Sequence, residues 1–154
     1  MTGTKQLIGR FLCVGASAVA LLAAGCASTP KNTVVLSGAQ EVPPVTTNAS
    51  GTSDLAITLS RCPSSGSNYN CPTVSGTVVT TGVQGTAAHI HSGAAGQSGP
   101  VVVPLVKMSD NVWAAPPATT VNDDMYRAFW AGGLYVNVHS AANPGGEIRA
   151  QLRP

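Results

Sequence analysis

The chain has three histidines, and their spacing could place them at one site. His89 and His91 are one residue apart in a segment typical of a β-strand, and His139 ends another such segment, Val136–His139. Alternate residues of a strand leave the same face, so His89 and His91 should point the same way, with Cα atoms about 6.5–7 Å apart. If the strand of His139 pairs beside them, three neutral imidazoles meet, which suits copper or zinc. The sequence therefore predicts a copper or zinc site with His89, His91 and His139 as ligands.

These histidines have two alternative roles. Histidines at strand ends can hydrogen-bond loop carbonyls and only hold down a Gly-rich segment such as 92–99, or one of them could be a catalytic base. The chain has no Ser-His-Asp order, phosphate-binding loop or dinucleotide fingerprint, which argues against an enzyme. A metal-dependent oxidoreductase is the enzymatic alternative, and no catalytic residue is assigned.

Glu147 is the acidic residue whose position suggests a supporting role. A carboxylate near a metal-binding histidine can accept its second N–H and so orient the ring. Alternatively, Glu147 pairs with Arg149 on the outward face of the same strand, and such exposed pairs contribute about 0–1 kcal/mol.

The N-terminus has the pattern of a signal peptide. Residues 1–10 carry Lys5 and Arg10 and no acidic residue, and residues 11–24 are apolar or small throughout. This run is too short for a comfortable membrane span and has the length of a signal-peptide core. We therefore expect export from the cytoplasm.

Cys26 follows small residues, as in the lipobox where a cysteine is acylated. Ala23 stands where that motif usually has a larger aliphatic residue. We expect residues 1–25 to be a lipoprotein signal peptide, Cys26 to carry the lipid and 26–33 to be a tether. The protein would then be anchored to the cell envelope, at the outer membrane or cell surface. The alternative is an ordinary signal peptide cut near Ala27.

The other cysteines fit an exported protein. Cys13 lies in the signal segment, whereas Cys62 and Cys71 bracket a polar loop. In an oxidising compartment this pair should form a disulfide, contributing about 2–3 kcal/mol. Their spacing, with no histidine near, does not match a zinc site.

The charge of the mature chain, residues 26–154, excludes one class of partner. It contains six basic and six acidic residues and is neutral. No basic patch supports nucleic-acid binding. The expected partners are the membrane, through the lipid, and an envelope or extracellular protein.

Short alternating segments separated by Gly and Pro predict an all-β fold. The expected class is an antiparallel β-sandwich or flattened barrel, Greek-key or immunoglobulin-like, with one short helix. The helix should span 122–131, with Asn122 as N-cap and Met125, Phe129 and Trp130 on its buried side. Strands are expected at 33–37, 52–59, 73–80, 86–91, 101–106, 111–113, 134–139 and 147–152, within a single domain over 34–154.

Several motifs recur in a fixed order: LSGAQEVPP at 36–44, AAHIHSG at 87–93, GPVV at 99–102, YVNVHS at 135–140 and PGGEIRAQL at 144–152. Together they resemble the CHRD domain, first described as repeats in chordin and common in bacterial secreted proteins. The resemblance covers about 34–153, and Ala150 departs from it where the family often has glycine. In chordin the repeats belong to an extracellular antagonist of growth factors, but nothing here transfers that partner. We expect a non-enzymatic, metal-binding bacterial lipoprotein; the alternative is a structural or protein-interaction module with no metal.

Overall fold

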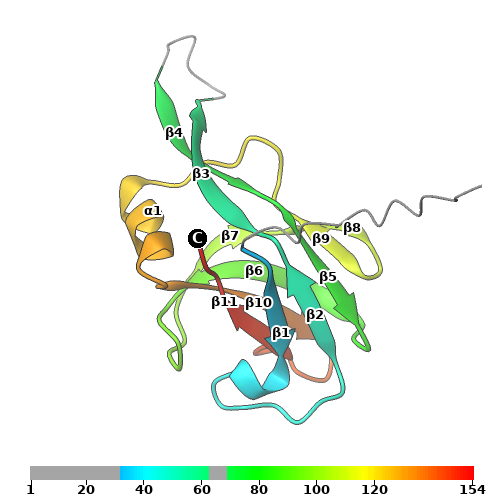
Figure 1. The fold of residues 1–154 in the computed structure, drawn as a ribbon. Coiled ribbons are helices and arrows are strands. Elements are labelled where there is room, and N and C mark those ends of the chain that lie inside the picture. The colour runs from blue at the N-terminus through cyan, green and yellow to red at the C-terminus, as the bar shows by residue number, and fades with distance from the viewer. Residues whose placement is uncertain (1–31, 63–68) are drawn as a thin grey trace, which may run out of the picture.

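The computed structural model describes residues 32–62 and 69–154, which form a curled antiparallel sheet, a hairpin and one α-helix (Figure 1). A short 3-10 helix, η1, spans Gly38–Gln40, and the α-helix, α1, spans Asp123–Trp130. The strands are β1 (Val34–Ser37), β2 (Ser50–Ser53), β3 (Ala56–Arg61), β4 (Asn70–Ser75), β5 (Thr77–Thr81), β6 (Gly85–Ser92), β7 (Val101–Pro104), β8 (Val106–Ser109), β9 (Val112–Ala114), β10 (Leu134–Ser140) and β11 (Ile148–Gln151).

Nine of these strands make one sheet in the order β7-β6-β10-β11-β1-β2-β5-β9-β8. The two edge strands, β7 and β8, are consecutive in the chain, so the sheet bends round on itself. Leu105, the residue between them, donates its N–H to the Ala88 carbonyl of β6 at 2.9 Å, so the chain stays bound to β6 where it turns from β7 into β8. The result is the flattened, nearly closed barrel predicted from the sequence, with a single short helix in the described part of the chain.

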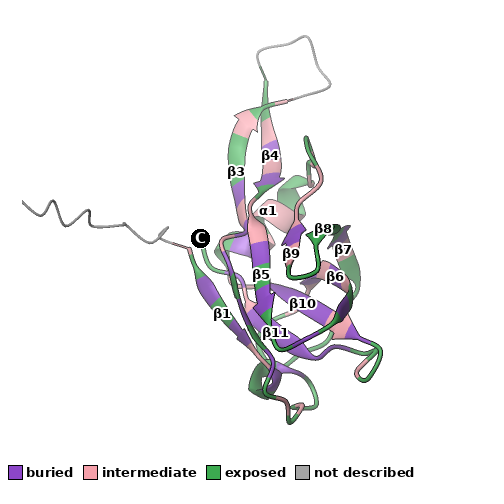
Figure 2. Cartoon of the chain, turned by 90° about the vertical axis from the view of Figure 1, so that its right-hand side faces the viewer, coloured by how far each residue is buried: buried purple, intermediate pink, exposed green. Residues whose placement is uncertain are grey.

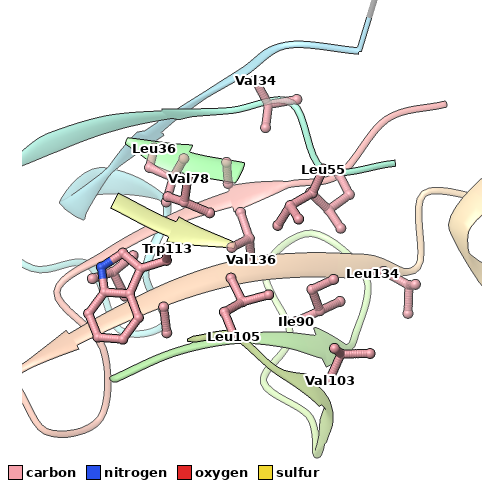
Figure 3. Close-up of a cluster of buried hydrophobic side chains, with 14 of the residues drawn as sticks. Val34, Leu36, Leu55, Val78, Ile90, Val103, Leu105, Trp113, Leu134 and Val136 are labelled. Atoms are coloured by element: carbon pink, nitrogen blue, oxygen red, sulfur yellow. The ribbon is translucent and has the colours of Figure 1, made fainter. Parts of the chain in front are cut away.

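The inside of the barrel is apolar because the strands alternate. Ile90 of β6, Val136 of β10 and Ile148 of β11 are at most 1 % exposed and point inward toward Leu36 and Val78 from the opposite wall. Figure 3 shows the side chains of Ile90, Val136, Leu36 and Val78 within one apolar cluster between the strands, with Trp113 at one end of the cluster. The strands β6, β10 and β11 therefore have their other face free for polar residues.

The predicted strand over 52–59 is wrong in one respect, because the structure divides it. The chain leaves the large sheet after β2, and β3 pairs with β4 in a separate hairpin that projects from the barrel (Figure 1). Leu55 is fully buried at the division, whereas Leu59, expected on the same buried face, is 54 % exposed on the hairpin.

The predicted strand over 73–80 is divided at the matching place. Gly76 has φ +108°, in the region that favours glycine, and a Cβ there would lie 2.7 Å from the Asp54 carbonyl oxygen. The Asp54 carboxylate accepts the Thr77 N–H at 2.6 Å and fixes the crossing. Similarly, 101–106 is divided where Leu105 turns into the core.

The helix α1 forms as predicted at its N-terminus. The Asn122 side chain accepts the Met125 N–H at 2.9 Å, and Phe129 is buried against the core. The expectation that Trp130 is buried is wrong: it is 59 % exposed. Among the described residues, no helix has the length and apolar character needed to cross a membrane.

Candidate metal centre

The three histidines lie on the outer face of the barrel wall formed by β6 and β10. In the antiparallel register, His89 is opposite Asn137, His91 is opposite Tyr135, and His139 is opposite Ala87. Directly opposed residues share a face of the sheet, so all three imidazoles leave the wall on the same side. The period-two spacing of His89 and His91 places them there, and strand pairing adds His139.

Loops cover this outer face, which explains an unexpected degree of burial. The alternation of β11 predicts that Glu147 and Arg149 face outward, and they do leave the core. However, Glu147 is only 8 % and Arg149 only 2 % exposed, and in Figure 2 β10 is coloured buried along most of its length. Over this wall lie the segment after η1, the 93–100 loop and the turn between β10 and β11.

The imidazole nitrogens are close enough to share a metal after a small adjustment. His89 Nδ1 lies 3.0 Å from His139 Nε2, and the ligand atoms of His89, His91 and His139 all lie within 4.8 Å of one another. With Zn–N bonds of 2.0–2.1 Å, nitrogens around one tetrahedral ion are about 3.3 Å apart. The longest of these separations therefore has to shorten by about 1.5 Å at most, and the group could hold a metal ion.

Two of the histidines are held in the form that a metal requires. His91 Nδ1 lies 3.0 Å from the Gly99 carbonyl oxygen, and His139 Nδ1 lies 2.9 Å from the Pro144 carbonyl oxygen. A carbonyl can only accept, so each Nδ1 carries the proton and each Nε2 has a free lone pair. This is the arrangement found around metal-binding histidines, where the second nitrogen is fixed by a carbonyl or carboxylate.

The surroundings also favour the neutral form of His89 and His91. Burial lowers the pKa of His89, and the nearby His139 and His91 lower it further. Burial likewise lowers the pKa of His91; the Gly99 carbonyl opposes this effect, and His139 and Arg149 add to it. Neutral imidazole is the ligand form, so little metal-binding free energy is lost to deprotonation near pH 7.

His91 is further fixed by a three-layer stack that crosses three strands. Its ring is parallel to that of Tyr135 on β10, with centroids 4.8 Å apart and an interplanar angle of 7°. The Arg149 guanidinium of β11 lies 3.4 Å from the centroid of the Tyr135 ring and donates to the Ala94 carbonyl at 3.1 Å. Gly99 N donates to the Tyr135 hydroxyl, so the stack and the 93–100 loop support each other.

Glu147 does not have the orienting role suggested by the sequence. Its carboxylate accepts from Thr47 Oγ1 at 2.8 Å, and the acceptors for His91 and His139 are main-chain carbonyls. The predicted Glu147–Arg149 pair is also absent: in the described parts of the chain the ion pair observed is Arg127–Asp124.

The cysteine predictions stay predictions. Cys62 and Cys71 are free thiols in this structure. In the β3–β4 register Cys71 is opposite Ser60, so Cys62 and Cys71 form a diagonal pair. The equivalent diagonal brings Ser60 Oγ within 2.6 Å of Thr73 Oγ1, so the hairpin suits a cross-link. Cys26 and the signal segment lie outside the described residues.

Other polar residues of this wall were missed by the sequence analysis, although part of the signal was present. Asn137 and Tyr135 alternate with the core residues of β10, so period two alone places them beside His139. Glu41 gave no such signal, since it lies 96 positions before Asn137, whose Nδ2 it binds at 3.0 Å. Burial raises the pKa of the Glu41 carboxyl to about 7, although Arg149 and the Asn137 hydrogen bond lower it.

The family model of the CHRD domain matches residues 32–152. The chain belongs to this family. The match spans almost the whole predicted domain and contains all three histidines and their carbonyl partners. None of the curated proteins and none of the solved structures matches the chain. The function of this CHRD domain must therefore be argued from its own residues.

Proposed function

We propose that this CHRD domain is a non-enzymatic, extracytoplasmic metal-binding module that takes one copper or zinc ion through His89, His91 and His139. The observation that carries the proposal is the state of His91: its Nε2 is buried and has no hydrogen-bond partner. Leaving a buried acceptor unsatisfied costs about 1–3 kcal/mol, whereas a bound metal would satisfy it. The purely structural role accounts for the Nδ1 contacts but not for this atom.

The His89–His139 contact supports the same conclusion. Because His139 Nδ1 holds its proton against Pro144, His139 Nε2 is an acceptor, and His89 Nδ1 donates to it in the metal-free protein. Metal binding would replace this hydrogen bond with two metal–nitrogen bonds, after the His89 proton moves to Nε2. The two nitrogens are already in contact, so little rearrangement of the wall is needed.

Calorimetry on the metal-free domain, residues 26–154, is the direct test. We expect one Zn²⁺ or Cu²⁺ per chain, and loss of that binding when His89 and His91 are both changed to Ala. The control is Gln97→Ala, an exposed side chain in the neighbouring loop, which should bind as the wild type does. Wild-type protein that takes up neither ion would overturn the proposal.

The proposed location rests on the N-terminal sequence. A basic start, an apolar run and small residues before Cys26 support a bacterial lipoprotein whose acyl chains hold the domain at the envelope. A tether of residues 26–33 would keep the metal centre near the membrane surface, where an envelope protein could exchange metal with it.

A further inference from the structure

A second unsatisfied acceptor lies on the same wall as the histidines. In the described residues, three buried side-chain atoms have no hydrogen-bond partner: His91 Nε2, Asn137 Oδ1 and Trp113 Nε1. The first two are acceptors on the outer face of β6 and β10, whereas Trp113 belongs to the core inside the barrel. Buried polar atoms without partners are few in folded proteins and need an explanation. Two of them on adjacent strands of one wall point to a common missing partner.

The orientation of the Asn137 side chain is fixed by Glu41. Asn137 Nδ2 lies 3.0 Å from each of the two Glu41 carboxylate oxygens. The contacts are made by Nδ2, whereas Oδ1 has no partner, so the NH₂ group of the amide faces the Glu41 carboxyl. Glu41 lies over the β10–β11 turn, because a Cβ at Gly146 would come within 2.8 Å of its oxygens. The Oδ1 limb of the planar amide is consequently turned away from that turn.

The strand register places the imidazoles beside the Asn137 side chain. On one side Asn137 is opposite Arg149 of β11, and on the other side it is opposite His89 of β6. Directly opposed residues have Cβ atoms about 4.5–5.5 Å apart, and His139 is two residues along the same face. Because Glu41 occupies the amide nitrogen, Oδ1 is the atom of this side chain that remains available to the neighbouring imidazoles.

We propose that Asn137 Oδ1 is the fourth ligand of the metal centre and that Glu41 is the positioning residue that holds it there. This inference rests on the proposed function and specifies it. Three imidazole nitrogens and one amide oxygen form a four-coordinate set for a divalent ion. Oxygen is a hard donor that Cu⁺ disfavours, so the set selects Zn²⁺ or Cu²⁺ over Cu⁺.

NMR of the wild-type domain with Zn²⁺ tests the ligand without any substitution. The spectra are taken at pH 8, above the ordinary histidine pKa of about 6.5, because neutral imidazole is the form that binds a metal. We expect the Asn137 side-chain carboxamide ¹³C and ¹⁵N resonances to shift together with the three imidazoles. The Asn111 carboxamide, which is exposed in a turn, is the internal reference and should not shift.

The outcomes separate the two proposals. If the imidazoles shift while the Asn137 carboxamide does not, the fourth ligand is overturned and the three-histidine site stands. If no imidazole shifts, the proposed function itself fails.

An affinity measurement gives a second readout. Asn137→Leu should weaken Zn²⁺ binding by at least about tenfold, the lower end of the range for residues that support a metal site. Cu⁺ binding should change much less, because two or three imidazoles satisfy that ion. Asn111→Leu, an exposed asparagine in a turn, is the matched control. Equal loss of Zn²⁺ and Cu⁺ affinity in Asn137→Leu would contradict selection by the amide oxygen.

Discussion

Among single residues, Glu147 shows how the loops over the outer wall are held. Hydrogen bonding by Ser140 lowers the pKa of its carboxyl, burial opposes this, and hydrogen bonds from Thr47 and Asn143 lower it further. A carboxyl with a lowered folded-state pKa stabilises the fold above its unfolded pKa, and this contribution is lost as the pH falls through the folded value.

We therefore predict a pH-dependent cost for Glu147→Gln. At pH 7 the variant should lose about 1–2 kcal/mol of unfolding free energy, because a charged acceptor is replaced by a neutral one. The difference in unfolding free energy between wild type and variant should begin to narrow below pH 4.5, the ordinary pKa of a glutamate carboxyl. It should narrow further as the pH falls through the lowered pKa of Glu147 in the folded protein. Urea denaturation at pH 7 and pH 3 measures it, with the exposed Asp110→Asn as the control. A gap of equal size at both values would contradict this role.

The candidate ligands could be predicted from the sequence, but the groups that hold them could not. His89 and His91 share a face by strand periodicity, and His139 ends a second strand that could pair with theirs. The carbonyls of Gly99 and Pro144, which fix the tautomers, carry no side-chain signal. Glu41 reaches Asn137 only because the chain after η1 folds across the wall, a long-range contact that alternation does not encode.

At the level of elements, the β10–β11 turn must fit beneath Glu41 and Asn137. Gly146 has φ +138°, and a Cβ there would meet Asn137 Nδ2 and lie 2.8 Å from the Glu41 carboxylate oxygens. A Cβ added at the neighbouring Gly145 would meet no atom within 4 Å, and the φ of Gly145 is not positive. The two adjacent glycines therefore differ in their tolerance of a side chain.

Gly146→Ala should destabilise the domain, whereas Gly145→Ala should not. Backbone strain alone costs about 1–3 kcal/mol, and the displaced Glu41–Asn137 contact adds to it. Thermal or urea unfolding measures the effect. Gly145→Ala is expected within about 0.5 kcal/mol of wild type, as for an open surface position. Similar stability of the two variants would show that the turn has room for a side chain at Gly146.

Element prediction succeeded where a segment forms one strand of one sheet. It failed where the chain crosses to another sheet, at 52–59 and 73–80, or to the opposite edge of the same sheet, at 101–106. The segment at 134–139 was predicted almost to its ends because both its faces are buried within a single sheet. The segments at 52–59 and 73–80 keep their alternation through a crossing at Asp54 and Gly76, so the sequence pattern gives little sign of the break. Trp130 was misplaced because α1 covers the core with a narrow stripe centred on Phe129.

For the whole molecule, the barrel class follows from composition and alternation, and the closure of the barrel follows from tertiary packing. Strand alternation also places the three histidines of the proposed metal centre outside the apolar interior, on a wall whose second face is covered by loops rather than by another sheet. A site in that position is held by rigid strands and lies close to the surface. This suits a module that acquires or passes on a metal ion without opening its core.

The proposed location of this module in the cell depends on Cys26. If Cys26 is acylated, the mature protein should partition into the detergent phase of Triton X-114, since each buried CH₂ of an acyl chain contributes about 0.8 kcal/mol. Expressed as the full chain in a bacterial cell, Cys26→Ser should lose that partition and move to the aqueous phase. Cys62→Ser, a cysteine substitution within the barrel domain's hairpin, should leave the partition unchanged. Equal partition of Cys26→Ser and wild type would show that Cys26 carries no anchoring lipid.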